Sequence, residues 1–191
     1  MDNNYLSVKQ TLEQYGLTSS SLTMLRKAGI PTLYRGKKPY FLQSELDQWF
    51  ELQREDINKL KSNAIIDNET LAQTFKCSPQ GGMRRSHKTT TLVLVMNHTL
   101  GLYLDNWQGN ILHYTGMGQT GDQTLTGNQN ITLFESDTNK VDLHLFEVHK
   151  SNRYQYTGRV KLAGTPYQVT EKDTKNNNRL VWKFPLSVIH D

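Results

Sequence analysis

An aromatic ring, a glycine-rich bend and a run of amide side chains follow one another in residues 112–130, LHYTGMGQTGDQTLTGNQN. Tyr114 comes first, and Gly116, Gly118 and Gly121 follow it. This combination fits three kinds of site: a phosphate cradle, a tight structural turn, or a pocket for a nucleic-acid base that has left its stack. A P-loop is excluded because no lysine follows the glycines. The turn and the base pocket both remain open.

A carboxylate lies nine positions before the tyrosine, at Asp105. A carboxylate can accept a hydrogen bond from the N4 amino group of cytosine. Stacking on an aromatic ring returns about 1–3 kcal/mol per base, which offsets part of the unstacking cost. Residues of both kinds precede Tyr114, at Tyr103, Asp105 and Trp107. The alternatives are that Asp105 caps a turn in DNWQG and that Trp107 packs under a sheet.

Enzyme motifs are missing from the sequence. There is no GxSxG, P-loop or HExxH pattern. The histidines at 87, 98, 113, 144, 149 and 190 show no spacing with cysteine or acidic residues that predicts a zinc or HNH centre. We therefore expect no catalytic residue, no metal and no cofactor in this chain.

Residues 76–91 form a basic segment without an acidic residue. Two glycines in it would let the backbone approach a ligand closely, which favours a loop that contacts phosphates. A solvated basic loop is the alternative. The residues predicted to contact DNA are Gly81, Gly82, Arg84, Arg85, His87 and Lys88.

Composition sets broad limits. The chain has 191 residues, 36% hydrophobic and 21% charged, with a net charge of +4, which suits one ordinary domain or two small ones. No apolar run approaches the roughly 20 residues of a membrane span, so no membrane partner is expected. Cys77 is the single cysteine and excludes an internal disulfide. The N-terminus lacks the parts of a signal peptide, and a cytoplasmic location is the default expectation.

Residues 1 to about 52 predict a helical unit. Ser7 and Thr18 are good N-caps for two helices that end at Gly16 and Gly29. A small hairpin is expected in TLYRGKKPYFL, and a third helix after a cap at Ser44. We place a domain boundary near residue 62, giving domains 1–62 and 63–191.

This order of elements resembles the winged helix-turn-helix of the excisionase and MerR-like group, over residues 5–50. The resemblance implies that the second helix and the hairpin face DNA. A three-helix module that binds protein is the alternative. The residues implied to contact DNA are Ser19, Ser20, Ser21, Thr23, Arg26, Lys37 and Lys38.

The remainder of the chain predicts a mostly β domain, so the fold class is α+β. We expect a helix over residues 67–75 and a second one over 124–136, with Asp122 as a cap for the second. Strands are expected over residues 89–97, 111–116, 141–149, 152–164 and 179–189, with a polar turn over 171–178.

Several landmarks in this part resemble the SRA family, whose domains bind methylated cytosine in DNA. They are YTG at 114–116 with its glycine bend, Asp105, a DQxLTxxN-like segment from Asp122 that ends at Asn128 or Asn130, YxYxGxV from Tyr154, and VWKFPL from Val181. The resemblance covers residues 92–189 and implies an SRA-like curved sheet or barrel with embedded helices. The resemblance implies a base pocket in which Asp105 accepts from the cytosine, Tyr114 forms one face of the stack and Tyr103 or Trp107 forms the other. The implied pocket residues are Tyr103, Asp105, Trp107, Tyr114, Thr115 and Gly116.

The segment FKCSPQGGMRRS ahead of this domain resembles bacterial modification-dependent endonucleases, which often carry an HNH nuclease domain. The resemblance implies a reader of 5-methyl- or 5-hydroxymethylcytosine that flips the base out of double-stranded DNA, as the specificity part of a restriction system. An HNH domain or subunit outside these residues and a homodimer are left open. The alternative is a transcription or recombination factor whose β domain binds a ligand or protein.

One departure from the family concerns the space that a flipped base leaves in the duplex. Eukaryotic members carry a long insertion between the glycine bend and the DQ segment, whereas here only QTG separates Gly118 from Asp122. We expect Met83, Arg84 or Arg85 to fill that space, unless it stays open.

Overall fold

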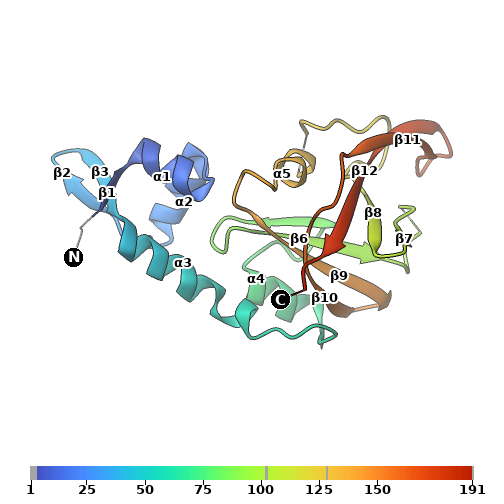
Figure 1. Cartoon of the computed structure of the whole chain (residues 1–191), viewed down its shortest axis with the longest axis horizontal. Coiled ribbons are helices and arrows are strands. Elements are labelled where there is room, and N and C mark those ends of the chain that lie inside the picture. The colour runs from blue at the N-terminus through green and yellow to red at the C-terminus, as the bar shows by residue number, and fades with distance from the viewer. Residues whose placement is uncertain (1–3, 102, 128, 191) are drawn as a thin grey trace.

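The computed structural model describes residues 4–101, 103–127 and 129–190. A small N-terminal unit and a larger sheet domain lie at opposite ends of one long helix, α3 (Figure 1). Among the described residues, no helix combines the length and apolar character needed to cross a bilayer.

The N-terminal unit is a three-stranded sheet and two short helices packed on the first half of α3. Its elements are β1 (Tyr5–Ser7), α1 (Val8–Tyr15), α2 (Ser19–Lys27), β2 (Leu33–Arg35), β3 (Lys38–Leu42) and α3 (Gln43–Asn58). The predicted N-caps of the first two helices are confirmed: Ser7 and Thr18 form capping boxes, and Gly16 ends α1 in the left-handed region at φ 59°. The hairpin is confirmed as β2 and β3, and β1 adds a third strand beside β3.

The start of α3 differs from the prediction. Ser44 lies inside the helix, whose N-cap is Leu42 and has no side-chain cap. Strand β3 leads directly into α3, and the Gln43 amide donates to the Asn4 carbonyl at 3.0 Å. The first amide of the helix is therefore hydrogen-bonded to the residue before β1, and the predicted serine cap is not needed.

The sheet domain begins with β4 (Ile65–Ile66) and α4 (Asn68–Phe75). The strands that follow are β5 (Met83–Ser86), β6 (Thr91–Asn97), β7 (Asn106–Gln108), β8 (Ile111–Thr115), β9 (Asp142–Lys150), β10 (Arg153–Leu162), β11 (Tyr167–Lys172) and β12 (Asn178–Val188), with α5 (Asn130–Phe134) between β8 and β9. Their order is β5-β6-β9-β10-β12-β8-β7, with β11 added to β12 and β4 to β10. The β6–β9 pair is parallel and the other pairs are antiparallel.

Two hydrophobic cores lie on the two faces of this sheet. Along β6, Leu92 and Leu94 enter the core inside the curled sheet, whereas Val93 and Val95 enter the outer core. Helix α4 and the end of α3 cover the outer core (Figure 1). This double burial explains why β6 reads as a continuous apolar run.

Three local predictions for this domain are wrong. The helix expected over 124–136 is only α5, and Asp122 caps nothing: it accepts from the Leu180 amide at 2.7 Å, so the bend is tied to β12. Part of the predicted basic loop is strand β5, paired with β6. Strands β7 and β11 were not expected, and the predicted polar turn shortens to the residues between β11 and β12.

Candidate functional site

A pocket of about 520 Å³ opens between β8 and the segment around β5, and we call it the β8 pocket. It is lined by Pro79, Gln80, Gly81, Gly82, Arg84, Val95, Asn97, Leu100, Tyr103, Asp105, Tyr114, Thr115, Gly116, Met117, Gly118, Gln119 and Tyr154. Five of the six residues predicted for a base pocket meet here. The sixth, Trp107, packs against the inner core of the sheet, which was the alternative we gave for it.

The Asp105 side chain is fixed by one of its oxygens. Its Oδ1 accepts from the Thr115 amide at 2.7 Å, so it braces β8 and does not cap a turn in its own hairpin. Burial raises the pKa of the Asp105 carboxyl above the ordinary value of 3.8, against the opposing effect of the Thr115 hydrogen bond and the Lys183 charge. Because Oδ1 accepts this hydrogen bond from the Thr115 amide, Oδ2 is the oxygen available to a ligand in the pocket.

Three tyrosines contribute to the pocket wall. Tyr114 is 3% exposed, and its hydroxyl donates to the Gly82 carbonyl at 2.8 Å, which joins β8 to the β5 side of the curled sheet. Tyr103 is half-buried, with its hydroxyl 3.4 Å from the Gly118 carbonyl. Tyr154, from β10, was missed as a pocket residue because sheet pairing alone brings it to this wall.

The glycine bend is held by two buried amide side chains. Gln123 donates to the Gly116 and Gly118 carbonyls at 2.6 and 3.2 Å, and Asn130 bonds both the amide and the carbonyl of Met117. A Cβ on Gly116 would lie 2.8 Å from Gln123 Oε1 and 3.0 Å from Asn130 Oδ1. The DQ…N segment is therefore a brace for the bend; Asn128, the other candidate for its last position, lies outside the described residues.

A buried lysine that was not among the predicted site residues, Lys183, bonds the backbone and a side chain next to the pocket. Lys183 Nζ donates to the Leu104 carbonyl at 2.8 Å and to Thr115 Oγ1 at 2.7 Å. The same ammonium pairs with Glu171, and both side chains are under 10% exposed. Lys183 thus ties the backbone beside Asp105 to the end of β8.

The two arginines of the basic segment turn inward, so neither is free to contact phosphates as predicted. Arg84 is 4% exposed. Its guanidinium donates to Asn68 Oδ1 at 2.7 Å and lies 5.3 Å from the centre of the Tyr154 ring. It is therefore part of the pocket wall.

The neighbours of Arg84 also turn inward. Arg85 donates to the Thr91 carbonyl at 3.1 Å, and burial together with the Arg54 charge lowers its pKa to about 10. Burial lowers the pKa of the half-buried His87. Met83, at 4% exposure, belongs to the inner core and is not available to fill a duplex. Strand pairing of β5 explains these positions.

The other residues predicted to contact DNA fall into two groups, buried or half-buried residues and residues at the surface. Gly82 is half-buried against the Tyr114 hydroxyl. Ser21 is 1% exposed, because its hydroxyl completes the capping box of α2, so its prediction as a DNA contact is wrong. The predicted contact residues that lie at the surface are Ser19, Ser20, Thr23, Arg26, Lys37, Lys38, Gly81 and Lys88.

A curled mixed sheet of this strand order, with an aspartate- and tyrosine-lined pocket at β8, is an SRA-type domain. The chain belongs to the family described as "ScoMcrA-like, SRA domain", whose model matches residues 62–190. No curated protein sequence matches this chain.

Solved structures share the fold at low sequence identity. The sulfur binding domain and SRA domain of ScoMcrA, complexed with phosphorothioated DNA, is 14% identical, with a TM-score of 0.58 over 69% of this chain and 40% of that one. The ScoMcrA phosphorothioation-dependent restriction endonuclease gives the same identity and TM-score, over 69% and 25%. The SUVH5 SRA domain with hemimethylated CG DNA is 23% identical, with a TM-score of 0.52 over 69% and 90%. This chain therefore spans well under half of either ScoMcrA chain.

Proposed function

We propose that this chain binds double-stranded DNA that carries a modified cytosine, and holds the flipped base in the β8 pocket. The observation that carries the proposal is the convergence of Asp105 with Tyr103, Tyr114 and Tyr154 in one pocket of an SRA-family domain. A volume of about 520 Å³ is within the range of small-ligand sites.

The two oxygens of Asp105 have separate roles in this proposal. Oδ1 stays on the Thr115 amide, and Oδ2 accepts from the cytosine N4 amino group. The tyrosine rings supply stacking and apolar contact, and the bend at Gly116 and Gly118 lets the backbone come close to the base or its phosphate. 5-Methyl- and 5-hydroxymethylcytosine are the candidate bases.

The N-terminal unit supplies a second contact with DNA as a winged helix-turn-helix. Residues 14–44 contain five basic residues and no acidic one. Arg26 donates to the Tyr34 hydroxyl and lies 5.6 Å from that ring centre, so α2 and the hairpin form one basic surface. Lys37 and Lys38 at the hairpin tip are exposed and would contact phosphates.

We place this activity in the restriction of modified foreign DNA, such as phage DNA. The chain is the reader, and any cleavage would come from an HNH domain or partner outside these residues. The domain division at residue 62 belongs to the same proposal. The fold relatives with phosphorothioated DNA make a sulfur-modified backbone the competing target that a test has to include.

Fluorescence anisotropy with four duplexes of one sequence tests the proposal: unmodified, 5-methylated, 5-hydroxymethylated and phosphorothioated. We expect tighter binding of a cytosine-modified duplex and loss of that preference, by about tenfold or more, in Asp105→Asn. This variant keeps an oxygen for the Thr115 amide and turns the base-facing atom into a donor. Asp137→Asn, a substitution of an exposed aspartate after α5, is the matched control.

Equal affinity of the wild type for all four duplexes would overturn the reader function. A preference for the phosphorothioated duplex alone would reassign the target to the backbone. An Asp105→Asn variant that keeps full discrimination would move the base pocket elsewhere.

A further inference from the structure

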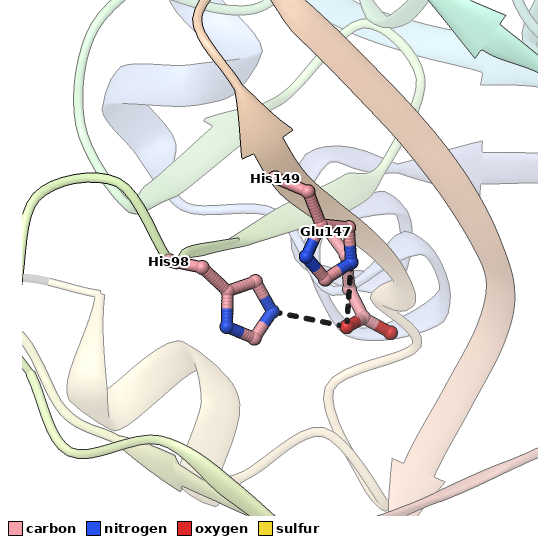
Figure 2. Close-up of side chains that lie close together, drawn as sticks. All are labelled: His98, Glu147 and His149. Carbon is pink, nitrogen blue, oxygen red and sulfur yellow. Dashed lines mark hydrogen bonds and ion pairs between the residues drawn. The ribbon is translucent and has the colours of Figure 1, made fainter.

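Three possible metal ligands meet at the carboxyl ends of β6 and β9: His98, Glu147 and His149 (Figure 2). His98 Nε2 lies 3.2 Å from Glu147 Oε2, and His149 Nε2 lies 3.7 Å from the same oxygen. The three donor atoms all lie within 4.8 Å of one another.

The parallel register of β6 and β9 creates this cluster. Asn97 pairs with Val148, and the His98 amide continues the ladder by donating to the Val148 carbonyl at 3.0 Å. Side chains alternate along a strand, so Glu147 and His149 project from the same face of β9. The two imidazole rings stack with their centres 4.3 Å apart and their planes 11° apart. Sequence spacing could not show this arrangement, because His98 is 49 residues from Glu147.

The donor distances match those around a tetrahedral zinc ion. Zinc binds imidazole nitrogen and carboxylate oxygen at about 2.0–2.2 Å, which places neighbouring donor atoms about 3.3 Å apart. The observed separations of 3.2 and 3.7 Å lie close to this value, and one of the two stacked imidazole rings has to rotate for both nitrogens to point at one ion. Two histidines and one glutamate are a ligand set that zinc uses with a fourth position left for water.

The surroundings favour a ligand role for the glutamate. Its other oxygen, Oε1, accepts from Thr157 Oγ1 at 3.2 Å, so Oε2 is directed at both histidines. Such outer contacts orient metal ligands in known sites. The Glu147 side chain is 17% exposed, and those of His98 and His149 are 36% and 60% exposed, so an ion can reach the cluster from solvent.

We propose that His98, Glu147 and His149 bind one Zn²⁺ ion. The ion would tie the start of the β6–β7 connection to β9. This connection carries Tyr103 and Asp105 of the β8 pocket, and Asn97, next to His98, lines the same pocket. Zinc would therefore order one wall of the pocket. The site does not depend on which DNA the pocket reads.

Isothermal titration calorimetry of the chain without a polyhistidine tag tests the site with Zn²⁺ alone. We expect one equivalent per chain. Affinity should fall by at least tenfold in His98→Ala, His149→Ala and Glu147→Gln, and by about tenfold in Thr157→Val. The matched control is His190→Ala, which removes an exposed histidine outside the cluster. This variant should bind Zn²⁺ like the wild type.

Two further readouts separate a metal site from a histidine–glutamate hydrogen-bond cluster. Co²⁺ in place of Zn²⁺ should give the visible absorption of a four-coordinate ion in the wild type and not in the His98→Ala/His149→Ala double variant. Zn²⁺ should slow amide exchange around Thr99 and Tyr103 only where the ligands are intact. Absence of stoichiometric Zn²⁺ binding by the wild type, or binding that survives in the double variant, would overturn the proposal.

Discussion

In the function proposed above, Asp105 accepts a hydrogen bond from the base, and we predict that its protonation makes DNA binding depend on pH. Because Oδ1 accepts from the Thr115 amide, a proton on Oδ2 would put a donor where N4 needs an acceptor, and burial raises the pKa of Asp105 above 3.8. We therefore predict that acidification weakens binding of the modified duplex from a higher pH than an ordinary aspartate would give. Anisotropy titrations across the acidic range check this. The unmodified duplex is the control, and a modified-duplex affinity that follows the control throughout contradicts the assignment.

His144 makes folding stability depend on pH. It is 4% exposed, with its Nδ1 2.8 Å from the Tyr156 hydroxyl, and burial with the Arg159 and Arg54 charges lowers its pKa from 6.5 to about 3. The unfolded chain binds this proton more readily, so stability is lost as the pH falls below 6.5. Between pH 7.5 and 5, we expect the group to account for a loss of about 2 kcal/mol.

Urea unfolding of the wild type and His144→Gln at both pH values measures this effect. The variant keeps a polar side chain that does not titrate, so its unfolding free energy should change less with pH than that of the wild type. The same pH dependence in both proteins would show that other groups control acid sensitivity.

Residues near one another in the chain were the ones that sequence could assign. The family pattern that implied the pocket includes Tyr103, Asp105, Tyr114, Thr115 and Gly116, which fall within one hairpin and the segment that leads into it. Tyr154 and Lys183 reach the pocket through strand pairing, and their side chains carry no local signal of it. The same holds for the cluster at His98.

At the scale of elements, the bend after β8 depends on a position without a side chain. Gly116→Ala places a Cβ against Gln123, Asn130 and the Phe184 ring, which lies 3.2 Å away. We predict a loss of about 1–3 kcal/mol in unfolding free energy, typical of overpacking, and weaker binding of modified DNA. Gly164→Ala is the control, because its Cβ meets only Pro185 at 3.8 Å. Equal stability of the two variants would contradict a packed bend.

The paired strands β11 and β12 carry a buried ion pair, Glu171 and Lys183, and Lys183 also bonds residues beside the pocket. Lys183→Met removes the ammonium from the Leu104 carbonyl and Thr115, and leaves Glu171 buried without its cation. Removing one partner of a buried ion pair costs about 3–5 kcal/mol. Chemical denaturation should show this loss, and Lys183→Met/Glu171→Leu should recover part of it. A single variant as stable as the wild type would mean that the pair is solvated.

The hairpin of β2 and β3 is expected to act through charge alone. Lys37→Ala/Lys38→Ala should weaken binding of every duplex to a similar degree and reduce the slope of log K against log salt by about 0.9 for each phosphate that the variant no longer neutralises. Lys9→Ala, exposed on α1, is the control. An unchanged slope would assign the N-terminal unit to protein contacts.

Sequence predicted the helices whose N-cap side chains bond their own first turn and the strands with alternating apolar residues. It did not predict elements whose conformation depends on pairing with another strand. Ser7, Thr18 and Asp67 are caps whose hydroxyl or carboxylate bonds the helix start locally. Strand β5 contains MRRS, which has no apolar alternation, and its strand conformation comes from pairing with β6. The amide-rich segment after the bend bonds backbone groups, so only five residues of the expected helix form as α5.

At the scale of the whole molecule, α3 joins two cores. Leu46 and Phe50 pack in the N-terminal core, and Ile57, two turns later, packs with Phe75 in the outer core of the sheet domain. Arg54 adds an ion pair with Asp142 at 3.1 Å. This helix and a direct contact, in which Lys140 Nζ donates to the Gln14 carbonyl at 2.6 Å, set the position of the N-terminal unit relative to the sheet.

The curl of the sheet completes the site. β8 and β6 lie near opposite ends of the strand order, yet the Tyr114 hydroxyl lies 3.4 Å from the Val95 carbonyl. Sequence could predict the strands but not this approach, because it depends on how far the sheet bends. The pocket is a product of the tertiary fold.

The most direct test is a crystal structure of the chain with a duplex that carries one 5-methylcytosine. The account predicts that this base leaves the helix and enters the β8 pocket, with its N4 about 3 Å from Asp105 Oδ2. A modified cytosine that stays stacked in the duplex while the protein is bound would contradict it.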